Sequence, residues 1–285
     1  MILFELFPAY TASAAIAAFA LSLLVGSFLN VIIYRLPVMM EREWQEAIQS
    51  ANQPDATPED TSTFNLAHPR SRCQECGHLI RWFENIPVVS WILLKGKCSQ
   101  CGTSISTRYP LIELFSACVG GFIGWQFGFT TLGLGLLVFT WALIALTFID
   151  IDHQLLPDAI TLPLLWLGLL LNSFELITTL EDAVWGAMLG YLSLWSVYWL
   201  FKLATGKEGM GFGDFKLLAA IGAWGGVLTL PMTILFSSVA GVLFAIIMMA
   251  TGKHQANNPM PFGPYLALAG WCAILWGGPI LSWYL

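Results

Sequence analysis

The sequence predicts an all-α protein that crosses a membrane about eight times and carries a small cytoplasmic insert between its first and second spans. Of its 285 residues, 57% are hydrophobic and only 11% are charged, whereas about 25% are charged in an ordinary soluble domain. The hydrophobic residues also gather in runs that suit a bilayer, for which roughly 17–25 residues are needed. These runs are 11–34, 111–128, 131–149, 159–177, 183–201, 215–230, 231–250 and 262–283.

The first run, 11–34, is preceded by MILFELFPAY, which contains no Lys or Arg. A cleavable signal peptide has a basic region at this position, so we expect the first run to be a retained membrane helix. This helix, within residues 1–34, is the first of three predicted domains. The other two are the cytoplasmic insert, 35–110, and a core of seven membrane helices, 111–285.

The basic residues predict the orientation of the chain, because Lys and Arg gather in cytoplasmic loops. Eight of the twelve lie between the first two runs. If that segment is cytoplasmic, alternation through eight spans places the other four on the same side and both termini on the opposite, periplasmic side. The eight are Arg35, Arg42, Arg70, Arg72, Arg81, Lys95, Lys97 and Arg108, and the four are Lys202, Lys207, Lys216 and Lys253.

The insert begins with a stretch that predicts an amphipathic helix. Met40, Trp44 and Ile48 are spaced four residues apart, so one face of this helix is apolar. That face can lie on the membrane surface or pack on its own domain. The following segment, ANQPDATPEDTST, is rich in Pro, Asp, Ser and Thr and predicts a flexible linker.

The last part of the insert repeats a cysteine pattern. CQECGHLI and CSQCGTSI each contain C-x2-C followed by Gly, which places thiols at Cys73, Cys76, Cys98 and Cys101. Two thiolates at this spacing can bind one tetrahedral ion from a single turn, so we predict a zinc-ribbon-like insert with these four zinc ligands. Redox or disulfide chemistry is disfavoured in a reducing cytosol, an iron centre is an alternative, and His78 is a possible substitute ligand.

Acidic residues at the ends of two predicted spans indicate a catalytic site. Asp150 ends the third run and Asp214 begins the sixth, and the predicted topology places both at the cytoplasmic face. A single edge acid is more often a helix cap or solvated, as we expect for Asp158, but acids at membrane depth are costly and usually functional. Two neighbouring carboxylates can share a proton, so that one activates water while the other polarises a carbonyl.

These segments together resemble the prepilin peptidases, which are membrane aspartic proteases with a G-x-G-D motif. The resemblance covers nearly the whole chain and rests on GSFLNVIIYRLP, HPRSRCQECG, the second cysteine pair, STRYPLIELF, IDIDHQLLPD and GFGD. It implies that Asp150 and Asp214 are the catalytic aspartates, with Asp152 as the alternative to Asp150.

The resemblance implies an enzyme of the bacterial inner membrane that removes the basic leader of type IV prepilins or type II secretion pseudopilins on the cytoplasmic side. Its partners are then these substrates and membrane lipid, and no nucleic acid. The resemblance also implies N-methylation of the new terminus with S-adenosylmethionine, for which the sequence shows no nucleotide-binding fingerprint. Arg108, Tyr109 and Glu113, near the start of the second run, either contribute to that site or anchor the chain at the membrane interface.

Two other functions remain as hypotheses. A proton-coupled transporter would use the acids as a relay, although such transporters have internal repeats and no repeat of this kind is found in the sequence. A membrane thiol oxidoreductase would use the two C-x-x-C pairs, and it predicts that the protein loses activity on Cys-to-Ser substitution and contains no zinc.

Overall fold

The computed structural model describes residues 10–52, 64–207, 209–251 and 260–284. Lys253 and most of the predicted linker lie outside these residues. In the described part of the chain, the regular elements are helices and two isolated β-bridges. The chain forms two compact units, Leu6–Phe129 and Thr130–Leu285, which are described in turn.

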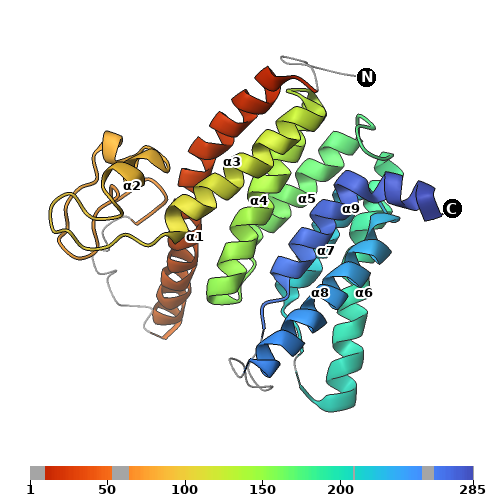
Figure 1. Cartoon of the computed structure of the whole chain (residues 1–285). Coiled ribbons are helices and arrows are strands. Elements are labelled where there is room, and N and C mark those ends of the chain that lie inside the picture. Colours follow the sequence, from red (N-terminus) through yellow and green to blue (C-terminus); the bar gives the residue numbers. More distant parts are fainter. Residues whose placement is uncertain (1–9, 53–63, 208, 252–259, 285) are drawn as a thin grey trace. The chain divides into compact units, whose positions relative to one another are not determined.

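The N-terminal unit consists of two long helices and the insert between them (Figure 1). Helix α1 (Ala12–Asn52) continues without interruption from the predicted first span into the predicted insert, with Pro37 inside it. Helix α3 (Arg108–Phe127) lies beside it. The insert contains a short 3-10 helix, η1 (Trp82–Asn85), and α2 (Val89–Leu93).

Small residues allow α1 and α3 to pack closely. Gly120 and Gly124 of α3, four residues apart, face Ser22 and Ala18 of α1 so closely that a Cβ atom on either glycine would overlap the facing side chain. The Ser116 hydroxyl donates a hydrogen bond across the same interface to the Ser22 carbonyl, at 3.0 Å. Such contacts are typical of helix pairs in membranes, where close backbone approach and polar contacts hold helices together.

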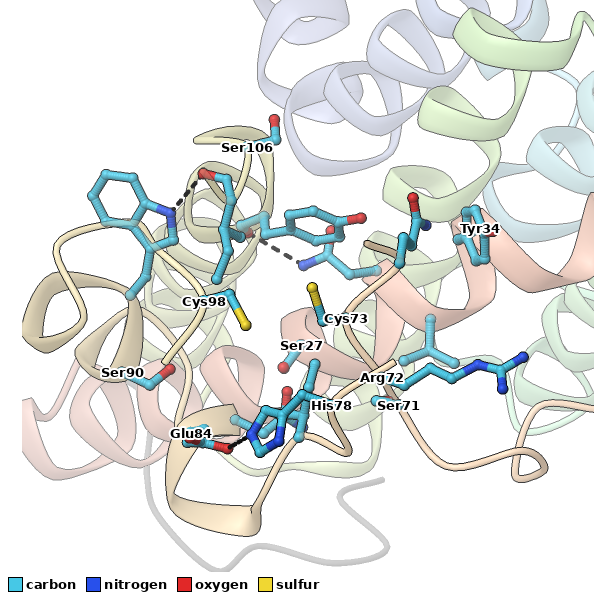
Figure 2. A pocket seen from close by; sticks show the side chains of 18 of the residues that line it. Ser27, Tyr34, Ser71, Arg72, Cys73, His78, Glu84, Ser90, Cys98 and Ser106 are labelled. Atoms are coloured by element: carbon cyan, nitrogen blue, oxygen red, sulfur yellow. Dashed lines mark hydrogen bonds and ion pairs between the residues drawn. The ribbon is translucent and has the colours of Figure 1, made fainter. Parts of the chain in front are cut away.

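Arg35 of α1 forms hydrogen bonds with the backbone of the insert. Its side chain is buried and donates hydrogen bonds to the carbonyl oxygens of Asn65, at 2.9 Å, and Pro69, at 2.7 Å. Its guanidinium also lies over the ring of Phe64, 5.7 Å from the centroid. Between α1, the insert and the start of α3, the structure contains a cavity of about 950 Å³ (Figure 2).

The C-terminal unit is a bundle of helices (Figure 1). They are α4 (Thr131–His153), α5 (Asp158–Asn172), α6 (Leu180–Thr205), α7 (Phe212–Gly225), α8 (Thr229–Ala250) and α9 (Gly263–Tyr284).

Helix α7 is the core of this unit, because nearly every residue from Asp214 to Trp224 is buried. Gly186 and Gly190 of α6 form a Gly-x-x-x-Gly pair that packs on its backbone. A Cβ atom on Gly190 would lie 2.7 Å from the Leu218 carbonyl oxygen, and one on Gly186 would overlap the carbonyl group of Gly222. Close packing of this kind leaves no freedom for α7 to slide along α6.

The C-terminal end of α7 is held by hydrogen bonds between α5 and α7. Asn172 is fully buried and donates hydrogen bonds to the carbonyl oxygens of Ala223 and Trp224, both at 2.9 Å. These carbonyl groups belong to the last turn of the helix, where no intrahelical donor is available. The indole N–H of Trp224 donates in turn to the Leu164 carbonyl at 2.8 Å, so the axial position of α7 is fixed.

The predicted fold class is confirmed, since each of the eight apolar runs contains a helix. Among the described residues, five helices are long and apolar enough to cross a membrane: α1, α3, α4, α6 and α8. Helices α5 and α7 have only 15 and 14 residues and are shorter than the roughly 17–25 residues of a usual span.

Candidate functional sites

The two aspartates that the sequence singles out lie in the same unit and are both buried. Asp150 belongs to the last turn of α4 and is 5% exposed, and Asp214 belongs to the first turn of α7 and is 7% exposed. The Asp150 carboxyl group is near enough to Asp214 to act on it electrostatically. Residues separated by 64 positions in the sequence are therefore brought to one site.

Asp150 is oriented by the N-terminus of α9. Its Oδ2 atom accepts a hydrogen bond from the amide of Gly263, the first residue of that helix, at 2.9 Å. The approach requires glycine, since a Cβ atom at 263 would lie 2.7 Å from the same oxygen. Amide groups at a helix N-terminus stabilise a negative charge, so this contact favours the ionised form of Asp150.

Asp214 has a different environment. Its Oδ1 atom is buried without a hydrogen-bond partner among the described residues. Its backbone amide donates a hydrogen bond to the Gly211 carbonyl at 3.3 Å. Gly211 is the N-cap residue of α7, so Asp214 does not have that role. A buried oxygen without a partner is costly, which indicates that it is kept for a group outside the described chain, such as a substrate or a water molecule.

Leu156, in the loop between α4 and α5, connects the surroundings of the two acids. A Cβ atom added to Gly213 would lie 2.7 Å from the Cβ atom of Leu156, and one added to Gly263 would lie 3.2 Å from the Cδ2 atom of Leu156. Two glycines, one beside each aspartate, thus make room for the same buried leucine. The sequence analysis missed both residues, because Leu156 is an apolar residue within the segment IDIDHQLLPD and Gly263 is remote from both acids in the sequence.

The other acids of this region are placed differently. Asp152 is exposed. Asp158 was expected to cap a helix, but it is the first residue of α5 and caps no backbone amide. Its two carboxylate oxygens instead lie 2.6 and 2.7 Å from Nζ of Lys216, which is on α7. This ion pair ties the start of α5 to α7 two residues beyond Asp214.

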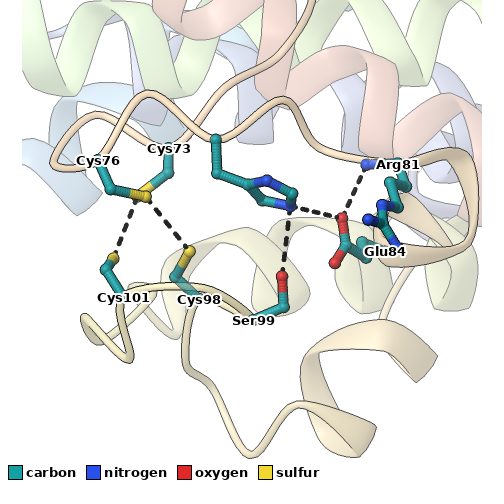
Figure 3. Close-up of polar contacts among 8 residues, drawn as sticks. Cys73, Cys76, Arg81, Glu84, Cys98, Ser99 and Cys101 are labelled. Atoms are coloured by element: carbon teal, nitrogen blue, oxygen red, sulfur yellow. Dashed lines mark hydrogen bonds and ion pairs between the residues drawn. The ribbon is translucent and has the colours of Figure 1, made fainter.

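The four cysteines converge in the insert of the N-terminal unit (Figure 3). Their sulfur atoms all lie within 4.8 Å of one another. Each pair occupies the same turn. The Cys73 amide donates to the His78 carbonyl and the Cys98 amide to the Thr103 carbonyl, both at 2.8 Å. The glycine after each pair, at positions 77 and 102, has a φ of 72°, a conformation that glycine adopts without strain.

The geometry of the sulfurs fits a tetrahedral metal ion. With Zn–S bonds of about 2.3 Å, the sulfurs of a tetrahedral site are about 3.8 Å apart. The distances between Cys73 and Cys101 and between Cys76 and Cys98 are 3.8 and 3.9 Å. Hydrogen bonds with Thr103 lower the pKa of Cys101 to about 6, which favours the thiolate that a metal binds.

His78 lies beside the four cysteines and contacts other side chains, so it is not part of the group of converging sulfur ligands. Its Nε2 atom lies 3.1 Å from Glu84 and 3.3 Å from the hydroxyl of Ser99, so it links the two cysteine turns. Hydrogen bonds from Ser99 and from the Arg81 amide lower the pKa of Glu84 to about 2. Glu84 therefore remains ionised at neutral pH and can hold the imidazole in place.

The three residues at the start of α3 have separate environments. Arg108 begins the helix. The Tyr109 carbonyl accepts a hydrogen bond from Asn30 at 3.2 Å, and the ring is 41% exposed. Glu113 is buried at 8% exposure and accepts a hydrogen bond from the Val88 amide at 2.7 Å. Tyr109 and Glu113 both line the cavity of about 950 Å³.

Comparison with known proteins assigns the chain to a family. The model of the bacterial peptidase A24 N-terminal domain matches residues 20–127, and the model of the type IV leader peptidase family matches residues 137–246. The prepilin leader peptidase/N-methyltransferase of Stutzerimonas stutzeri is 57% identical over 270 residues, which cover 95% of this chain and 93% of the relative. The protein of the same name from Pseudomonas aeruginosa is 56% identical over 265 residues, or 93% and 91%.

A more distant relative of the same name, from Neisseria gonorrhoeae, is 51% identical over 255 residues, which cover 89% of this chain and 87% of the relative. No solved structure matches the chain significantly. Both halves of the chain match a family model, and the relatives extend over nearly the whole length of each protein. The chain therefore belongs to the type IV leader peptidase family.

Proposed function

We propose that this protein is a membrane aspartic endopeptidase that removes the basic leader of type IV prepilins or type II secretion pseudopilins, and that it methylates the new N-terminus. The observation that carries the peptidase assignment is the meeting of two buried carboxyl groups, Asp150 and Asp214, from separate helices of one unit. The relatives, which are named prepilin leader peptidase/N-methyltransferase, support both activities.

The two aspartates have different roles in this proposal. Asp150 accepts the Gly263 amide hydrogen bond, so it is the ionised partner and takes a proton from the attacking water. Asp214, whose Oδ1 atom has no described partner, carries the shared proton and donates it to the scissile carbonyl. The charge of Asp150 disfavours ionisation of Asp214, so in this proposal the pair has one base and one acid at the same time.

The proposed topology brings the substrate to these residues. The placement of Lys and Arg supports a cytoplasmic insert, 35–110, with both termini periplasmic and the peptidase residues within the core 111–285, following the first membrane helix, 1–34. A prepilin inserts its apolar stem in the bilayer and keeps its basic leader in the cytoplasm. Its scissile bond then lies at the cytoplasmic membrane edge, where this topology also places Asp150 and Asp214.

A structural zinc ion completes the insert in this proposal. The four converging sulfurs support zinc because tetrahedral thiolate sets are typical of it. The ion would hold the two cysteine turns together, as Cys73, Cys76, Cys98 and Cys101 come from both turns. The methyl donor would be S-adenosylmethionine, which supplies a methyl group on a positively charged sulfur.

The peptidase proposal is tested with the detergent-purified full chain and a prepilin, by following the removal of the leader. Asp150→Asn and Asp214→Asn each remove a carboxyl group from the pair, so we expect each to lower the cleavage rate by at least about 100-fold. Asp152→Asn, at an exposed site, is the matched control and should retain cleavage. If Asp152→Asn loses cleavage while Asp150→Asn retains it, the base has been assigned to the wrong residue.

The comparisons support neither of the other hypotheses. A transporter or a thiol oxidoreductase would not account for matches to both peptidase family models. Elemental analysis also separates the oxidoreductase from the peptidase, because it should find about one zinc ion per chain in a peptidase of the proposed kind.

A further inference from the structure

The cavity of the N-terminal unit has the size and the lining of a small-molecule site. Its volume of about 950 Å³ lies within the range of roughly 300–1,000 Å³ that is usual for ligand pockets. Residues of α1, of both cysteine turns and of the start of α3 line it (Figure 2). Cys73 and Cys98 form part of its wall, so the cluster of four cysteines shapes the cavity.

Glu113 is a buried carboxyl group in this wall, and it has no charged partner among the described residues. Its carboxylate accepts hydrogen bonds from the Val88 amide, at 2.7 Å, and from the Ser27 hydroxyl. Both donors are neutral, and no Lys, Arg or His in the described part of the chain pairs with it. A buried carboxylate is stabilised most by a positive charge. The cavity can therefore attract a cationic ligand to Glu113.

The rest of the lining offers groups for the other parts of such a ligand. Tyr34 of α1 is 52% exposed and faces the cavity, and an aromatic ring of this kind can stack on a nucleobase. Arg70 and Arg72 also line the cavity and can pair with a carboxylate. One ligand class combines a nucleobase, a carboxylate and cationic centres, namely an adenosyl sulfonium amino acid.

We propose that this cavity binds S-adenosylmethionine, with Glu113 contacting a cationic centre of the donor and Tyr34 contacting its adenine. The inference rests on the proposed methyltransferase function and gives that function a site within the N-terminal unit. In the reaction, the lone pair of the new N-terminal amine forms a bond to the methyl carbon. The carbon–sulfur bond breaks, its electron pair remains on sulfur to give a neutral thioether, and one amine proton is released to water.

Equilibrium binding of radiolabelled S-adenosylmethionine to the purified full chain tests the site without a turnover assay. Glu113→Gln keeps the shape of the side chain and removes its charge, so we expect the dissociation constant to rise by about 10-fold or more. Glu46→Gln is the matched control, because it makes the same charge change at an exposed position of α1 outside the cavity. Its dissociation constant should stay within about twofold of the original protein.

Tyr34→Ala provides a second, independent variant if Glu113→Gln fails to fold. The ring is half exposed, so its removal should leave folding intact while weakening binding by about 10-fold. Trp44→Ala, which removes another exposed ring of α1 outside the cavity, should leave binding unchanged. The melting temperature and metal content of each variant report on folding.

The outcomes separate this inference from the function on which it rests. Unchanged affinity in folded Glu113→Gln and Tyr34→Ala would overturn the cavity assignment, even if the original protein binds the donor and cleaves prepilin. Failure of the original protein to cleave prepilin would instead contradict the proposed peptidase. Cleavage without any binding of S-adenosylmethionine would overturn the donor site and leave the peptidase standing.

Discussion

Replacement of Gly263 by alanine tests whether the N-terminus of α9 positions the proposed catalytic pair, Asp150 and Asp214. The new methyl group would lie 2.7 Å from Asp150 Oδ2, and side chains essentially never approach closer than 3.0 Å. The carboxylate or the helix must shift by at least 0.3 Å, and by 0.7 Å to reach an ordinary contact of 3.4 Å. A misplacement of 1 Å can cost about 100-fold in rate, so we expect kcat to fall by between about fourfold and about 25-fold.

The assay is leader removal from a prepilin under saturating substrate. Gly277→Ala is the matched control, because it makes the same substitution in α9 at a position where an added methyl group meets nothing within 4 Å. The alanine in either variant favours the helix, so stability should not fall for reasons of helix propensity. A folded Gly263→Ala variant that cleaves at the original rate would show that the Asp150 contact does not orient the acid.

Three further substitutions probe the packing, the metal and the ion pair. Gly186→Ala would place a methyl group against the Gly222 carbonyl, and we expect the C-terminal unit to lose about 1–3 kcal/mol of stability, seen as a lower melting temperature in detergent. Cys73→Ser removes one of the four converging thiols and should reduce zinc from about one ion per chain to near none; equal zinc in both proteins would contradict the site. Asp158→Asn breaks the ion pair with Lys216, and because this pair is partly exposed, the free energy of unfolding should fall by no more than about 1 kcal/mol.

The membrane helices could be located from hydrophobic runs, but their lengths could not. The runs 159–177 and 215–230 contain helices of only 15 and 14 residues. Helix α5 ends at Asn172, whose side chain turns to cap α7, and this tertiary contact is not visible in the local sequence. Helix α1 likewise continues past Pro37 to Asn52, although a proline inside a helix removes one backbone hydrogen bond and usually ends or kinks the helix.

The sequence predicted those residues of the candidate sites that belong to a recognisable motif. The repeated C-x2-C-G pattern indicated the sulfur cluster, and the topology argument indicated that Asp150 and Asp214 share one membrane face. The surroundings of these residues carry no such signal. Gly263 is 113 positions from Asp150, and only the folded backbone shows that its amide meets the carboxylate. Glu113 was noted in the sequence, but its burial beside a cavity required the structure.

The shortness of α7 bears on how water reaches a reaction inside a lipid environment. A helix of 14 residues is about 21 Å long at a rise of 1.5 Å per residue, whereas the hydrocarbon layer is about 30 Å thick. One end of α7 must therefore stop short of the lipid headgroups, or the bilayer must become thinner around it. Asp214 is in the first turn, so if the N-terminal end of α7 stops short of the headgroups, or if the bilayer thins there, water can reach the acids from that side. In the proposed reaction, hydrolysis would then take place beside this water while the apolar stem of the pilin stays in the lipid.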